Sequence, residues 1–241
     1  MSQPFNLSNP DRPIHVGVIL MAGVTELMDV APIDMLHGLT KTFLDPVPDA
    51  LVPPDLKSQA LEKVHFHWVS EAGPSVPSRL TSGLSIIPTH DFTTCPPLDL
   101  VLIGAHNLGY EPTETELAFV RKAYEQSTAF ITVCGGVEVA LRAGILSRGK
   151  TATGPREMLP MLRQMSGPGT DWVEKRWVRD GKLWTSGALL NGMDLMRGFG
   201  EEVWGGKEEK EEKEEKGHGS LVGFMLDMGC FPVRDVDYRD V

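Results

Sequence analysis

Short apolar runs recur along the chain and predict the strands of a sheet. Residues 14–20, 98–103 and 130–133 are rich in β-branched and aliphatic side chains, which is typical of strands buried on both faces of a parallel sheet. Residues 64–70 alternate between apolar and polar positions and predict another strand. Residues 177–185 contain two strand-like runs around an Asp-Gly pair and predict a hairpin.

The segments between these runs have the period of helices. Thr113 followed by Glu116 forms a capping-box pattern, and an apolar stripe continues from it. A second helical pattern covers residues 29–36, with Asp29 placed as its N-cap and Pro32 in a position that the first turn tolerates. Strands that alternate with helices predict an α/β domain with a mostly parallel sheet, whose ligands bind at the carboxyl ends of the strands.

We expect the whole chain, residues 1–241, to form a single domain, because its length and composition suffice for one core. Three segments lack the strand and helix patterns and are expected at the surface: a polar arm at residues 1–13, a proline-rich excursion at residues 44–60, and a Glu/Lys segment at residues 205–219.

The composition excludes several classes of protein. A net charge of −10 argues against a nucleic-acid partner, since that affinity comes from Lys and Arg side chains. No signal peptide or membrane-spanning run is recognisable, so we expect a cytoplasmic protein without a membrane partner. The three cysteines are widely spaced, and neither metal-ligand spacing nor a phosphate- or dinucleotide-binding fingerprint occurs. We therefore expect free thiols, no metal and no cofactor.

Cys134 is the leading candidate for chemistry. It ends a buried strand and precedes Gly135 and Gly136, after which an Ala/Val/Leu-rich helical segment begins. Such a strand, tight turn and helix can expose a nucleophile, as the serine elbow of hydrolases does. Free N–H groups at a helix start favour a thiolate, which is the reactive form of cysteine. Cys95 and Cys230 lack this setting and are expected to be structural or incidental.

A nucleophilic cysteine needs a base or acid and donors for a developing oxyanion. Gly104 and Ala105 follow a strand end in a turn of small residues, so their backbone N–H groups, with that of Gly135, are the predicted donors. His106 lies in the same turn and is the best candidate base among the histidines, although a packing role remains open.

These motifs together resemble the ThiJ/PfpI superfamily, which includes the isocyanide hydratases and shares its fold with glutamine amidotransferase domains. The resemblance implies a flavodoxin-like three-layer αβα sandwich, a homodimer, and an elbow cysteine at Cys134 that acts on a small-molecule substrate. It extends from about residue 14 to residue 204 and rests on residues 29–36, 134–136, 143–146, 150–153 and 179–187.

The chain departs from the family pattern at the acid that contacts the cysteine. That acid normally stands four residues before the proline of the first helix, where this chain has Met28. Asp29 follows one position later, and Glu26 precedes by two. Either a one-residue shift lets Asp29 serve as the acid, or Asp29 only caps the helix and the acid is absent.

The histidines of many family members are also missing, because Gly135 and Gly154 occupy their positions. Amide hydrolysis is therefore disfavoured unless His106 substitutes. The leading hypothesis is a cysteine-dependent hydratase or lyase acting on a small electrophile, an isocyanide or an α-oxoaldehyde, with Asp29 or Glu26 as the acid. The alternatives are a non-catalytic redox-sensing homodimer that uses an oxidisable cysteine, and a tailoring enzyme of a biosynthetic pathway.

Overall fold

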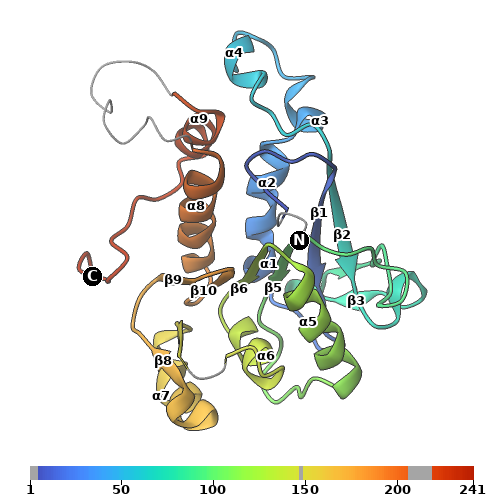
Figure 1. Ribbon diagram of the computed structural model, residues 1–241, viewed down its shortest axis with the longest axis vertical. Coiled ribbons are helices and arrows are strands. Elements are labelled where there is room, and N and C mark those ends of the chain that lie inside the picture. Colours follow the sequence, from blue (N-terminus) through green and yellow to red (C-terminus); the bar gives the residue numbers. More distant parts are fainter. Residues whose placement is uncertain (1–4, 147–148, 206–218) are drawn as a thin grey trace.

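A computed structural model describes residues 5–146, 149–205 and 219–241. Its centre is a six-stranded sheet in which four consecutive pairs of strands run parallel and the last pair runs antiparallel (Figure 1). This confirms the predicted α/β class with a mostly parallel sheet. In spatial order the strands are β2 (Val64–Val69), β1 (Ile14–Ile19), β5 (Leu100–Ile103), β6 (Ala129–Thr132), β10 (Leu183–Ser186) and β9 (Trp177–Asp180).

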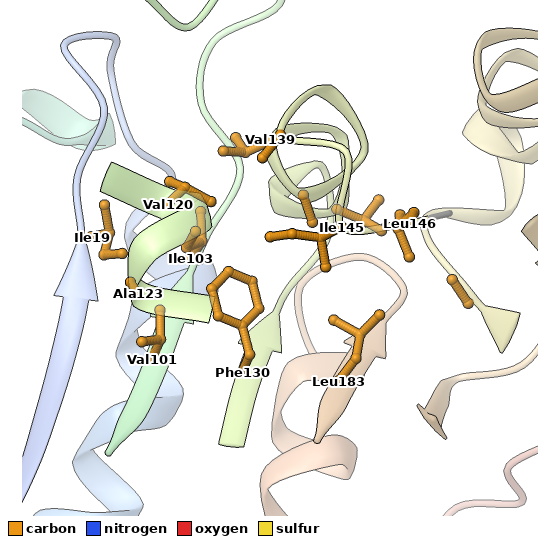
Figure 2. Close-up of a cluster of buried hydrophobic side chains, with 14 of the residues drawn as sticks. Ile19, Val101, Ile103, Val120, Ala123, Phe130, Val139, Ile145, Leu146 and Leu183 are labelled. Atoms are coloured by element: carbon orange, nitrogen blue, oxygen red, sulfur yellow. The ribbon is translucent and has the colours of Figure 1, made fainter. Parts of the chain in front are cut away.

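Hydrophobic clusters cover both faces of the sheet, so the domain has three layers. Phe130 of β6 points into one cluster, together with side chains from α5 (Glu114–Gln126), α6 (Gly136–Arg142) and α7 (Leu159–Ser166) (Figure 2). Its neighbour Ile131 points into the opposite cluster, with α8 (Asn191–Trp204) and the first helices of the chain. Every residue of β6 is buried, and all but Thr132 are apolar, as expected for a strand covered on both faces.

The first helical region is broken into pieces around Pro32. It consists of α1 (Leu27–Val30), a 3₁₀ turn (Ala31–Ile33) and α2 (Asp34–Gly38). The prediction that Asp29 caps a helix was wrong, because α1 begins at Leu27 and Glu26 occupies the capping position. Asp29 lies inside the first turn instead, and its side chain is free to face the sheet.

The proline-rich segment is more ordered than its sequence suggested. It follows α3 (Lys41–Leu44) and contains α4 (Pro54–Lys57). Its apolar side chains, including Val52 and Leu56, form a third cluster with α9 (Leu221–Met228). Residues 44–60 are therefore not purely an irregular surface excursion, because the segment contains α4 and packs against α9.

Smaller elements complete the described chain. Two additional two-stranded sheets, which the sequence did not predict in this form, are β3 (Ser78–Arg79) with β4 (Ser85–Ile86), and β7 (Lys150–Ala152) with β8 (Thr170–Trp172). The N-terminal arm is held by buried Leu7 and by an ion pair between Arg12 and Asp99 at 2.6 Å. Most of the charged segment predicted at residues 205–219 lies outside the described residues. None of the described helices has the length and apolar character needed to cross a membrane.

Candidate active site

Cys134 lies in a strained turn at the carboxyl end of β6. Its φ of 57° is in the left-handed region, which costs a non-glycine residue of the order of 1 kcal/mol or more. The Cys134 N–H donates to the C=O of Gly187 at 3.2 Å, which ties this turn to the end of β10. Gly136 is required by packing, because a Cβ there would lie 2.3 Å from the carbonyl oxygen of Ile103. The predicted strand, turn and helix are thus present.

The thiol is almost enclosed, since only 9% of Cys134 is exposed. Burial is the largest factor that raises the pKa of the thiol, to about 12, and the negative charges of Asp29 and Glu26 act in the same direction. The backbone N–H groups of Gly135 and Leu189 lower it by less. The backbone donors at the helix start favour the thiolate, as expected, but burial and two carboxylates outweigh them.

Asp29 is fully buried and faces this thiol, while its neighbour Met28 is 43% exposed. The Ala105 N–H donates to Oδ2 of Asp29 at 3.0 Å. Gly104 makes room for the carboxyl, because a Cβ at this position would lie 2.9 Å from the Asp29 Cβ. Of the two alternatives left by the sequence, the structure supports the one-residue shift that brings Asp29 to the cysteine.

Burial also raises the pKa of Asp29, to about 7, and the charge of Glu26 adds to the rise. The Ala105 N–H, the Cys134 thiol and the Leu189 N–H lower it by stabilising the carboxylate. The other oxygen, Oδ1, is buried and makes no hydrogen bond of good geometry to the described residues. Asp29 can therefore gain or lose a proton near neutral pH, and one of its oxygens is available to a substrate or to the thiol.

Glu26 completes a group of three ionisable side chains. One oxygen from each of Glu26 and Asp29 and the sulfur of Cys134 lie within 4.8 Å of one another. The Glu26 N–H donates to the Ala105 C=O at 2.8 Å, which fixes its position. Two carboxylates and a thiol at this spacing could ligate a divalent cation, but only after the thiol lost its proton. Its raised pKa opposes that loss.

Comparison with known proteins shows the family of this chain. The family model described as the DJ-1/PfpI family matches residues 59–202. The chain belongs to the DJ-1/PfpI family. An isonitrile hydratase from Pseudomonas putida is 30% identical over 197 residues, which cover 80% of this chain and 73% of the relative.

Solved structures of the family have the same fold. A ThiJ/PfpI family protein from Pseudomonas syringae superposes with a TM-score of 0.64 at 18% identity, over 93% of this chain and 77% of the other. DJ-1beta from Drosophila melanogaster superposes with a TM-score of 0.61 at 15% identity, over 92% of this chain and all of the other. At these identities the likeness concerns the fold alone.

His106, the predicted base, follows β5 and pairs through its backbone with Thr25. Its ring meets the ring of Tyr110 edge-on, with 5.0 Å between centroids, and its Nδ1 is buried without a hydrogen-bond partner in the described residues. Burial lowers the pKa of His106, so the ring is neutral at pH 7. The principal groups that set the pKa of Cys134 do not include His106. Its catalytic role in this DJ-1/PfpI protein stays a prediction.

The backbone donors differ in part from those expected. The Ala105 N–H is already engaged by Asp29, and the Gly135 N–H is directed to the sulfur of Cys134. Leu189, which sequence reasoning missed, adds a further N–H from the turn between β10 and α8. The sequence held one indication of this role. Leu189 shortly follows β10, which lies beside β6 in the sheet, and the carboxyl ends of neighbouring parallel strands lie close together.

The other two cysteines are in ordinary settings. Cys95 packs against the α5 side of the core, and burial raises its pKa to about 11. Cys230 is exposed near the C-terminus. Neither is among the groups that act on Cys134.

Proposed function

We propose that this protein hydrates a small isocyanide to the corresponding N-substituted formamide, R–N≡C + H₂O → R–NH–CHO, with Cys134 as nucleophile and Asp29 as proton carrier. The observation that carries the proposal is the buried Asp29 carboxyl, with a pKa of about 7, beside a thiol that keeps its own proton. The isonitrile hydratase relative from Pseudomonas putida supports this choice of substrate class.

In the first step, the ionised Asp29 accepts the thiol proton while the Cys134 sulfur bonds to the terminal carbon of the isocyanide. Asp29 then delivers the same proton to that carbon. The net change is addition of S–H across the carbon, which gives a covalent thioimidate, R–N=CH–S–Cys134. A buried carboxyl with a pKa near the working pH is suited to this transfer, because it can both take and give a proton.

In the second step, water attacks the carbon of the thioimidate while Asp29 again accepts a proton and passes one to the nitrogen. The tetrahedral adduct, R–NH–CH(OH)–S–Cys134, then expels the cysteine. The C–S bond breaks, the hydroxyl proton returns through Asp29 to the sulfur, and the formamide leaves. Burial of the sulfur and of Asp29 excludes bulk water from the proton path.

The site favours this reaction over amide hydrolysis. Hydrolysis by cysteine enzymes relies on a histidine that deprotonates the thiol and then protonates a leaving amine. At the positions where many family members have histidine, this chain has Gly135 and Gly154. An isocyanide has no leaving group, and its terminal carbon accepts both nucleophile and proton, so one carboxyl beside the thiol suffices.

The test is turnover of one alkyl and one aryl isocyanide, with formamide measured by mass spectrometry and proton NMR. We expect turnover by the wild type and by Cys95→Ala and Cys230→Ala, and none by Cys134→Ala. A stalled thioimidate should add the mass of the isocyanide to the peptide that contains Cys134. Turnover that survives in Cys134→Ala would refute the proposal, and so would turnover of an α-oxoaldehyde but of neither isocyanide.

A further inference from the structure

The C-terminal segment, residues 234–241, packs against the turn at residues 187–190 that joins β10 to α8. We infer that Tyr238 is a positioning residue of the active site, which acts through Asn191 on this turn. The inference deepens the proposed function and rests on it for the identity of the site.

The turn reaches the reactive groups through its backbone. The C=O of Gly187 accepts the Cys134 N–H at 3.2 Å. The N–H of Leu189 lowers the pKa of both Cys134 and Asp29, which places it against the thiol and the carboxyl together. A shift of this turn would therefore change the backbone that carries the thiol and remove a donor from both reactive side chains.

Tyr238 and Asn191 hold the opposite side of the same turn. The Nδ2 of Asn191 donates to the hydroxyl of Tyr238 at 2.8 Å. Both side chains lie against Gly187, since a Cβ there would be 2.5 Å from the Asn191 Nδ2 and 2.9 Å from the Tyr238 hydroxyl. The Asn191 N–H also donates to the C=O of Ala188 at 3.1 Å. The turn is thus enclosed between Cys134 on one side and the Tyr238–Asn191 pair on the other.

Arg176 binds the C-terminal segment beside the turn at residues 187–190. Only 3% of Arg176 is exposed, and its guanidinium is bound by the Asp240 carboxylate at 2.7 Å, the Asp235 C=O at 2.9 Å and the Asn191 Oδ1 at 3.3 Å. It also lies 4.5 Å from the centre of the Tyr238 ring. A buried charge needs such partners, and the C-terminal segment provides most of them.

The backbone of Arg176 belongs to the same network. Its N–H donates to the C=O of Val236 at 2.8 Å, and its C=O accepts the N–H of Gly187 at 2.9 Å. One residue therefore joins the C-terminal segment directly to the turn.

Backbone strain is concentrated along this connection. Five non-glycine residues of the described chain have positive φ, and three of them are Cys134 at 57°, Leu189 at 49° and Tyr238 at 59°. Each such conformation is unfavourable and persists only where surrounding contacts hold it. The Leu189 N–H acts on the Cys134 thiol, so loss of the contacts behind Leu189 would let its turn relax away from the thiol.

The variant Tyr238→Phe tests the inference, because it removes one oxygen and keeps the ring beside Arg176. The readout is the rate at which iodoacetamide alkylates Cys134 between pH 5 and pH 9, measured by mass spectrometry of the Cys134 peptide. In the wild type we expect an inflection near pH 7 from Asp29. In Tyr238→Phe and Asn191→Ala we expect the inflection about 0.5 to 1 pH unit higher, because the Leu189 N–H, which lowers the pKa of Asp29, moves away from the carboxyl.

The matched control is Arg239→Gln, which removes only ion pairs to Asp235 and Asp237 at the surface of the same segment. We expect its inflection at the wild-type pH. Hydrogen exchange of the amides at residues 187–190 gives a second readout for any variant of lowered stability, and it should be at least threefold faster in Tyr238→Phe. An unchanged inflection together with unchanged exchange in Tyr238→Phe would overturn the inference.

Neither readout uses an isocyanide, so the two proposals fail separately. If the wild type turns over no isocyanide but Tyr238→Phe moves the inflection, the proposed reaction is wrong and the positioning role stands. If isocyanides are turned over and Tyr238→Phe matches the wild type in both the alkylation inflection and hydrogen exchange, the positioning role is wrong and the reaction stands.

Discussion

The Cys134 thiol lowers the pKa of Asp29, whereas the Asp29 charge raises the pKa of Cys134. Both effects have one cause, because a thiol that keeps its proton stabilises a neighbouring carboxylate. Below pH 7 each group carries a proton, and above pH 7 one proton remains for the pair. The pair is therefore arranged to move a proton between sulfur and oxygen, and it does not hold a permanent thiolate.

Removal of the proton carrier should stop catalysis while the nucleophile remains. We expect Asp29→Asn to lower kcat for isocyanide hydration about 10²- to 10⁴-fold, the usual range for a lost general acid–base group. Glu26→Gln should cost less than about tenfold, since Glu26 acts on the pair through its charge. Steady-state kinetics of both variants measure this, and equal losses would contradict the assignment of Asp29.

The pH profile of the wild type should follow the ionisation of Asp29. The carboxylate must be free to accept the thiol proton, so kcat/KM should rise as pH increases toward 7 and level off above it. In Asp29→Asn the residual rate should lack this rise. A rate that falls as the pH rises through 7 would show that protonated Asp29 is the form required at the start of the reaction.

Asp29 should also lower stability at neutral pH. Its pKa is raised in the folded state from 3.8 to about 7, so its contribution to the free energy of unfolding declines as pH rises between these values. At pH 8 we expect the free energy of unfolding of Asp29→Asn, measured by chemical denaturation, to exceed that of the wild type by about 1 to 3 kcal/mol. Near pH 4 we expect the two free energies to be equal. A destabilised variant at pH 8 would indicate that the Ala105 contact dominates.

A histidine cluster at the β1–β2 edge should make the fold sensitive to acid. The Nε2 of His67 lies 2.9 Å from the Nδ1 of His15, with His65 and His90 nearby, and burial lowers the pKa of His67 from 6.5 to about 4. Stability from neutral His67 is complete above pH 6.5 and is lost as pH falls toward 4. Chemical denaturation should show that the free energy of unfolding falls by up to about 2 kcal/mol between pH 6.5 and pH 4. The fall should be smaller in His67→Gln.

The enclosed, protonated thiol should resist oxidation, since the thiolate is the form that peroxide attacks. After mild peroxide treatment we expect Cys134 to be modified no faster than exposed Cys230, with mass spectrometry as the measurement. Selective oxidation of Cys134 in the wild type would favour the redox-sensing alternative.

Local sequence patterns were enough to predict the main strands and the capped helix, because each of these elements is determined by a few neighbouring residues. The capping box at Thr113 and Glu116, the hairpin at residues 177–185 and the buried strands all appear where the pattern placed them. The apolar period cannot show which small sheets form from short segments, so the pairing of β7 with β8 was missed. The packing of residues 44–60 against α9 joins parts of the chain far apart in sequence, and no local pattern reports it.

The sequence named Cys134 and two candidate acids but left open whether either acid reaches the thiol. In the structure Cys134, Asp29 and Glu26 lie close together. The ionisation of the thiol was not predictable, because it depends on how completely Asp29 and Cys134 are buried. Leu189 contributes only its backbone, so its side chain carried no sign of its role.

The two glycines after Cys134 differ in how strictly the fold requires them, which matters in a search for this motif in other sequences. No side chain fits at Gly136, where the carbonyl of Ile103 stands in the way, so that glycine marks the backbone architecture whatever the protein does. At Gly135 a Cβ would meet only Ala105, whose Cβ would lie 3.2 Å away, a contact that a small movement can relieve. Position 135 is thus where related chains are free to diverge, and the residue found there is the better guide to their chemistry.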